Sequence, residues 1–139
     1  MSCPRELDGI DASWLAVDAQ GQVAIFTTGG EGPIPETALA SIETGEESVQ
    51  SLPEVSAHEL LTSMPRPTDF VSFARRGLFA YDWSDVHRVA SEVSGGYELQ
   101  ALPISPIRVS QLPTSMQVLA GATQLAGIVF GSKLIVVGT

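Results

Sequence analysis

The stretch that most constrains the fold is residues 14–28, WLAVDAQGQVAIFTT. Two apolar runs, 14–17 and 23–26, are separated by residues that include Asp18 and Gly21, which suit a turn with a positive φ. The stretch therefore predicts a β-hairpin. Its apolar residues fall on both faces, and a lone two-stranded ribbon is only marginally stable in water. We therefore expect the other helices and strands to cover both faces.

After this hairpin, helical and strand-like segments alternate without the regular order of βαβ units. Apolar spacing and end signals predict helices over about 35–44, 56–64, 69–76 and 114–126. Gly45 and Gly77 are expected to end the first and third of these. Aromatic content and alternation predict strands at 78–83 and 97–102, and residues 128–137 resemble a second hairpin or a final buried strand.

Two hairpins require antiparallel pairing, so we expect the α+β class. The prediction is a single domain whose mainly antiparallel sheet carries N-terminal and C-terminal hairpins packed against several short helices. The length of 139 residues favours one domain over 1–139, with 1–12 as a loose N-terminal arm. Aromatic residues of the predicted strands are assigned to the core: Trp14, Phe26, Phe79, Tyr81 and Trp83.

Cys3 is the only cysteine, which excludes an intrachain disulfide and a multi-cysteine metal site. The charged N-terminus does not fit a signal peptide, and each long apolar stretch is interrupted by polar residues. We therefore expect a soluble, cytoplasmic protein.

The net charge of −9 is concentrated in the first half of the chain. Between Glu6 and Pro65 there are eleven acidic residues and no Lys or Arg. An acidic field repels nucleic acid and anionic membranes and speeds association with a basic partner. The alternative is that the acidic charge serves only solubility, since many soluble proteins have a low pI. Direct nucleic-acid binding is disfavoured, because the few basic residues are scattered except for Arg75 and Arg76.

Catalytic and metal-binding motifs fail where they can be tested. His58-Glu59 begins like the HExxH helix of metalloproteases, but Thr62 stands where the second histidine would be. Asp82, Asp85 and His87 are more typical of a helix cap and a solvated face than of a cation site. No G-x-S-x-G elbow is present. No catalytic residue, metal or cofactor is predicted, and an enzyme is the less favoured reading.

A glycine-rich turn, Gly29-Gly30-Glu31-Gly32, follows the second strand and precedes a helix. A phosphate-binding loop has the same position between a strand and a helix. This turn lacks the Lys-Ser/Thr pair of such a loop, and Glu31 and Glu36 would repel a phosphate there. The turn is interpreted as backbone geometry. Pro33 and Pro35 would make it a rigid protrusion suited to contacting another protein.

Three strings, WLAVDAQGQVAIFTTGGEGPIP, FARRGLFAYDW and LPxSMQxLAGATQLAGIVF, together resemble a group of short, mostly uncharacterised bacterial proteins regarded as candidate immunity proteins of toxin systems. The resemblance implies a cytoplasmic protein that binds and neutralises a cognate toxin and has no catalysis of its own. It assigns no functional residues.

The leading hypothesis is a non-catalytic protein-binding module, an immunity-type inhibitor that binds a basic toxin through an acidic surface. The expected contact residues are Glu31, Glu36, Glu43, Glu46 and Glu47. The alternative is a small-molecule-binding protein or enzyme with a pocket lined by Tyr81, Trp83, Asp85 and His87. A third possibility is a structural or oligomeric subunit, since the sequence leaves the oligomeric state open.

Overall fold

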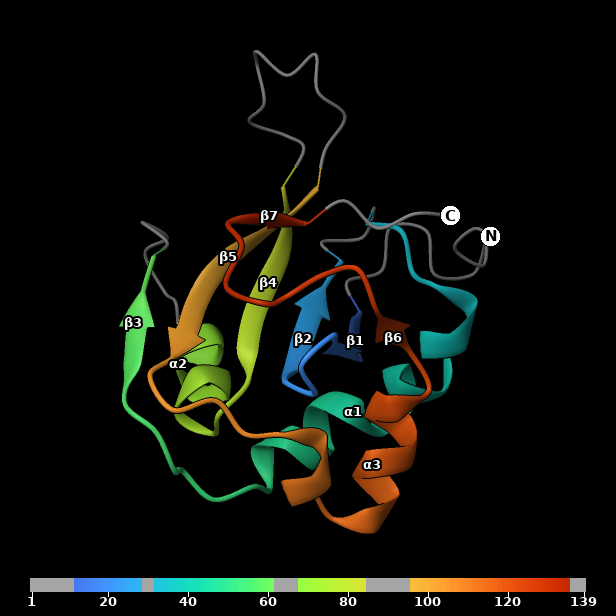
Figure 1. Ribbon diagram of the computed structural model, residues 1–139, viewed down its shortest axis with the longest axis horizontal. Helices are drawn as coiled ribbons and strands as arrows, with labels where there is room; N and C mark the ends of the chain where they lie inside the picture. Colours follow the sequence, from blue (N-terminus) through green and yellow to red (C-terminus); the bar gives the residue numbers. More distant parts are fainter. Residues whose placement is uncertain (1–11, 29–31, 62–67, 85–95, 136–139) are drawn as a thin grey trace.

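The computed structural model describes residues 12–28, 32–61, 68–84 and 96–135. They form a seven-stranded sheet in the order β3-β5-β4-β2-β1-β6, with β7 pairing onto β5 (Figure 1). The strands are β1 Ser13–Asp18, β2 Val23–Thr27, β3 His58–Leu60, β4 Phe79–Ser84, β5 Gly96–Pro103, β6 Gln124–Leu125 and β7 Leu134–Ile135. The helices are η2 Glu36–Ala38, α1 Ala40–Gln50, α2 Thr68–Arg75, η3 Val109–Gln111 and α3 Thr114–Gly121.

The predicted α+β class is confirmed, and the sheet is mostly antiparallel. Strands β2 and β4 pair in parallel, as do β1 and β6, while the other pairs are antiparallel. The connection from β2 to β4 includes the helices α1 and α2, which return the chain to the same end of the sheet and allow the parallel pair.

The N-terminal hairpin is confirmed, with Val17 opposite Val23 and Gly21 at a φ of 81°. The buried carboxylate of Asp18 organises its turn. Oδ1 accepts hydrogen bonds from the backbone N–H of Gln20 (2.9 Å) and of Gln22 (2.8 Å). Oδ2 accepts from the Gln22 side chain and from the backbone N–H of Phe130, each at 2.8 Å. One side chain thus fixes the turn and anchors the C-terminal segment to it.

The first face of the sheet is covered by the three α-helices. Leu15 and Ile25 project into this layer from the hairpin, where they join side chains of all three helices. The helix residues fully or nearly buried there are Val49 of α1, Phe70, Phe73 and Ala74 of α2, and Met116 and Ala120 of α3. Burying this apolar surface is the main force that holds short helices in place.

The opposite face is aromatic. Trp14 stacks on Phe26, with ring centroids 4.2 Å apart, and meets the edge of Tyr97. The indole Nε1 of Trp14 donates to the Tyr97 hydroxyl (3.2 Å), which donates to the carbonyl of Pro33 (2.9 Å). Phe130 of the C-terminal segment packs edge-on against Phe26. All five predicted core aromatics lie in this layer, and only Trp83 is partly exposed.

Of the two predictions for residues 128–137, the hairpin is wrong for the described residues, and a short final strand, β7, forms at Leu134–Ile135. Residues 126–135 cross the aromatic face (red in Figure 1), and β7 pairs with β5 through Tyr97–Ile135 and Glu98–Leu134. Phe130 is anchored by Asp18 instead of pairing within a terminal ribbon. The aromatic layer needs a cover, and burying Phe130 and Ile135 in it stabilises the fold more than an exposed hairpin would.

Three helix predictions need correction. Gly45 does not end α1 but lies buried inside it, next to Leu15 of β1. The described part of the helix predicted over 56–64, residues 56–61, instead contains the edge strand β3, where backbone pairing with β5 overrides local helix signals, and residues 62–64 lie outside the described residues. Helix α3 ends at Gly121, because the Thr123 carbonyl accepts a hydrogen bond from the Val17 N–H and the chain enters β6.

The predicted strands at 78–83 and 97–102 and the helix before Gly77 are confirmed as β4, β5 and α2. Gly77 adopts a φ of 95°, and the N–H of Leu78 donates to the Phe73 carbonyl (3.1 Å) to close the helix end. The described part of the glycine-rich turn is not a protrusion. Gly32 lies against Tyr97, and Ile34 is buried in the aromatic layer.

Candidate functional site

The structure places most of the predicted acidic contact residues on one continuous stretch. Glu36 lies on η2, and Glu43, Glu46 and Glu47 lie on α1, which follows directly. Glu36, Glu46 and Glu47 are exposed. Glu31 lies outside the described residues. Four of the five predicted residues therefore share the η2–α1 stretch, which we call the acidic stretch (Glu36, Glu43, Glu46 and Glu47).

The helix that carries these residues is held firmly against β1. The Ser41 hydroxyl accepts a hydrogen bond from the Leu15 N–H (3.0 Å) and donates to the Ala38 carbonyl (2.8 Å). Ser13 at the start of β1 donates to the Glu46 carboxylate (3.1 Å). These bonds fix α1 on the sheet.

Two acidic residues of α1 lie where a negative charge is unfavourable for the helix. Glu46 and Glu47 stand in its C-terminal half, next to the negative end of the dipole, and its last turn has no basic residue. Within the described residues, no ion pair involves Glu36, Glu46 or Glu47. Glu46 accepts the hydrogen bond from Ser13, whereas helix stability does not account for Glu47.

The described ion pairs lie elsewhere. Glu54 reaches Arg75 at 4.0 Å and Arg76 at 3.8 Å. Arg75 and Glu54 are about half exposed, so this pair contributes little to stability. Arg75 and Arg76 therefore pair with Glu54, which is not part of the acidic stretch.

The alternative pocket near Tyr81 and Trp83 is only partly described, because Asp85 and His87 lie outside the described residues. Tyr81 is fully buried, and its hydroxyl donates to the Ser132 carbonyl (2.7 Å) and accepts from the Gly131 N–H (3.0 Å). Burial raises the pKa of Tyr81 to about 12. Both hydrogen bonds are made to the C-terminal segment, so the Tyr81 hydroxyl holds that segment on the aromatic layer.

Trp83 ends the aromatic layer, with its ring 5.3 Å from that of Tyr97. Its indole Nε1 is buried without a hydrogen-bond partner in the part of the chain that the structure describes.

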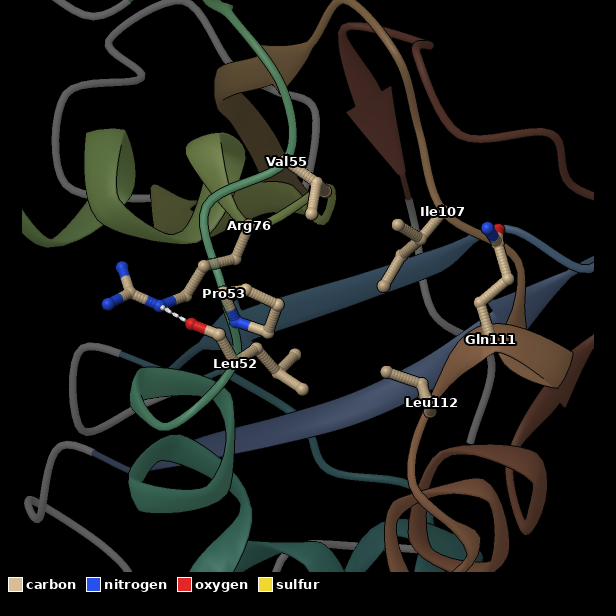
Figure 2. Close-up of a pocket in the computed structure, with 7 residues that line it drawn as sticks. All are labelled: Leu52, Pro53, Val55, Arg76, Ile107, Gln111 and Leu112. Carbon is tan, nitrogen blue, oxygen red and sulfur yellow. Dashed lines mark hydrogen bonds between the residues drawn. The ribbon is translucent and has the colours of Figure 1, made fainter.

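A cavity of about 160 Å³ opens at a different place, between the segment after α1 and the segment around η3 (Figure 2). Its lining is mostly aliphatic: Leu52, Pro53, Val55, Arg76, Ile107, Gln111 and Leu112. The Arg76 guanidinium points away from Ile107 and Gln111, and its Nε donates to the Leu52 carbonyl (2.9 Å). The cavity can hold an apolar group, but no nucleophile or general base lines it.

Sequence reasoning did not find this cavity. Its walls come from residues 52–55, 76 and 107–112, which no local pattern connects. Only the apolar character of Leu52, Ile107 and Leu112 was visible in the sequence, and that is equally typical of core residues.

Across residues 12–28, 32–61, 68–84 and 96–135, no three His, Cys, Asp or Glu side chains gather closely enough to hold a metal ion. No helix in these ranges is both long and apolar enough to cross a bilayer. Comparison with family models, with curated proteins and with solved structures found no match.

Proposed function

We propose that this chain is a non-catalytic protein-binding module that acts in the cytoplasm as an immunity-type inhibitor of a basic partner such as a toxin. The observation that carries the proposal is the acidic stretch. Glu36 on η2 and Glu46 and Glu47 on α1 are exposed, α1 is fixed on β1, and within the described residues no cation pairs with these three. Glu46 and Glu47 lie in the C-terminal half of α1, where carboxylates oppose the helix dipole, so the dipole gives no reason for their placement.

The physical reason for a basic partner is electrostatic complementarity. The protein has a net charge of −9, and carboxylates without a paired cation add to its negative field. This field attracts a cationic surface and raises the association rate. Such binding weakens as salt screens the charges, over a Debye length of about 8 Å at physiological ionic strength. The same field opposes binding to nucleic acid and to anionic membranes.

The test is a pull-down from the native host with the tagged protein at low and high salt, followed by mass spectrometry. A stoichiometric basic protein that is lost at high salt is the expected result. The affinity for that protein is then measured for a variant with all five predicted glutamates, Glu31, Glu36, Glu43, Glu46 and Glu47, changed to Gln. We expect at least a tenfold loss at low salt, equal to about 1.4 kcal/mol.

A matched pair of variants separates local charge from net charge. Glu36→Gln with Glu47→Gln removes two charges from the acidic stretch, and Glu54→Gln with Asp69→Asn removes two exposed charges elsewhere. The first pair should weaken binding and flatten its salt dependence more than the second. Equal effects of the two pairs, or an unchanged affinity in the fivefold variant, would refute the acidic stretch as the interface.

The cavity supports a second candidate function, binding of a small apolar molecule. Its volume of about 160 Å³ resembles the size of engineered cavities that bind benzene. Native mass spectrometry of protein purified from its host tests this candidate. A bound small molecule displaced by Leu112→Trp, which fills the cavity, would favour it over the inhibitor. The pocket predicted at Tyr81, Trp83, Asp85 and His87 belongs to the same alternative, but Tyr81 is fully buried and its hydroxyl is bonded to the C-terminal segment.

A further inference from the structure

Strand β3 forms one edge of the sheet and has β5 on one side (Figure 1). The Leu61 N–H donates to the Gln100 carbonyl (2.8 Å), and the Ala57 carbonyl accepts from the Ile104 N–H (2.9 Å). Residues 57, 59 and 61 therefore direct their backbone groups toward β5. Because alternate residues of a strand face opposite sides, His58 and Leu60 direct theirs outward. These outward groups make no hydrogen bond with the described residues.

The open edge is also apolar. Leu60 and Leu61 at this edge are 41% and 39% exposed. Apolar surface next to unpaired backbone groups is what an added strand covers.

Charge alternates with these apolar residues. Glu59 is exposed and pairs in register with Leu102, whose side chain belongs to the aromatic layer, while Leu60 pairs with Ala101 of the helix-covered layer. Glu59 therefore projects from one face of the edge and Leu60 from the other. A strand added beside β3 would lie next to the Glu59 carboxylate on one face of the sheet and next to the Leu60 side chain on the opposite face.

We propose that the β3 edge binds an extended segment of a protein partner as an additional strand, and that this segment alternates apolar and basic side chains. The basic residue lies beside Glu59, and the apolar residues on either side of it lie beside His58 and Leu60. The inference rests on the proposed function only in taking the partner to be a protein with basic character. It uses a surface other than the acidic stretch.

A second copy of this chain does not fit the same edge. The antiparallel register that uses both open residues pairs His58 with Leu60 of the other copy, which sets Glu59 directly against Glu59. Like charges opposite each other on neighbouring strands are destabilising, and each chain also carries a net charge of −9. The occupant is therefore a segment of opposite charge.

The test uses the full chain and a short synthetic peptide of alternating valine and lysine, with a valine–glutamate peptide of equal length as the charge control. Binding is measured by NMR titration, and the site by amide hydrogen exchange. We expect the lysine peptide to protect the amides of His58 and Leu60 and the glutamate peptide to leave them unprotected. Glu59→Gln should weaken binding of the lysine peptide and reduce its salt dependence.

A pair of variants isolates the backbone contribution. His58→Pro removes the outward N–H at the first residue of the strand, a position where proline is tolerated, and His58→Ala keeps that N–H. Loss of one hydrogen bond should make His58→Pro bind the lysine peptide about fivefold more weakly than His58→Ala. Both variants must first retain the wild-type pattern of amide signals in β4 and β2, which shows that the sheet is intact.

Equal affinities of the two His58 variants, protection confined to α1, or equal binding of the glutamate peptide would each overturn the proposal. So would a dimer in sedimentation that His58→Pro dissociates, because the occupant would then be a second copy. The Glu36→Gln and Glu47→Gln pair should leave peptide binding unchanged. Failure at β3 and failure of the acidic stretch are therefore separate results.

Discussion

Removing the carboxylate of Asp18 should destabilise the protein more than any other single change to a charged side chain in the described structure. Asp18 is only 5% exposed, yet its two oxygens accept hydrogen bonds from four donors. Three belong to the β1–β2 turn at Gln20 and Gln22. The fourth, the N–H of Phe130, lies 112 residues away in the segment that covers the aromatic layer. A single residue therefore links two distant parts of the chain.

The expected loss follows from what each donor is left with in Asp18→Ala. The buried N–H of Phe130 has no replacement partner, which costs about 1–3 kcal/mol. The turn donors at Gln20 and Gln22 are exposed or half-buried and can bind water, so together they lose about 1 kcal/mol. The total is about 3 kcal/mol, a large part of the 5–15 kcal/mol typical of a domain. Asp18→Asn keeps one acceptor oxygen and should lose about half as much.

The assay is equilibrium unfolding in urea, followed by the fluorescence of Trp14 and Trp83, together with hydrogen exchange of the Phe130 amide. Exchange at Phe130 should become much faster in Asp18→Ala. Asp69→Ala removes an exposed carboxylate from the first turn of α2 and should cost less than about 1 kcal/mol. The reasoning is refuted if Asp18→Ala costs no more than Asp69→Ala, or if the Phe130 amide stays protected.

Two further predictions concern the backbone and the aromatic layer. Gly77→Ala should lower the unfolding free energy by about 2–4 kcal/mol, because its φ is 95° and the new Cβ would lie 2.6 Å from Ile107 Cγ2. Gly121→Ala, with open space around it in α3, should instead raise stability by about 0.5–1 kcal/mol, and urea unfolding compares the two. The pKa of Tyr81 rises from 10.0 to about 12 on folding, so its stabilising effect is complete below about pH 10 and is lost as the pH rises through about 12. Tyr81→Phe should therefore lose less unfolding free energy than the wild type between pH 9 and pH 12.

The sequence predicted the elements whose signals are local. The β1–β2 hairpin depends on Asp18 and Gly21, and the end of α2 depends on Gly77, so a short window contains all the information. The α+β class followed from these pieces. In each case, backbone conformation and side-chain chemistry point to the same structure.

The wrong predictions concern segments whose structure depends on distant partners. Residues 58–60 become a strand because β5, some forty residues later, offers a free edge, and the local signals that predict a helix over 56–64 have no bearing on that. Residues 126–135 cover the aromatic layer because Asp18 binds Phe130. Neither contact has a signature within its own segment, so local patterns favoured a helix and a hairpin.

The candidate surfaces divide in the same way. The acidic stretch was predictable, because several acidic residues close together in one segment are visible in the sequence. The β3 edge and the cavity were not, because both depend on which segments the sheet brings together. His58 and Glu59 were singled out only for a metalloprotease motif that fails, whereas their backbone positions give them their proposed role.

The position of the two proposed interfaces in the sheet makes them physically independent. Strand β3 and strand β1, on which α1 docks, are four steps apart in the strand order. At about 4.8 Å per step, this separation is about 19 Å, roughly twice the Debye length at physiological ionic strength. A charge removed from the acidic stretch is therefore largely screened at Glu59, and the reverse also holds. A partner that uses both surfaces must reach across the sheet, with a folded basic surface on α1 and an extended segment at β3.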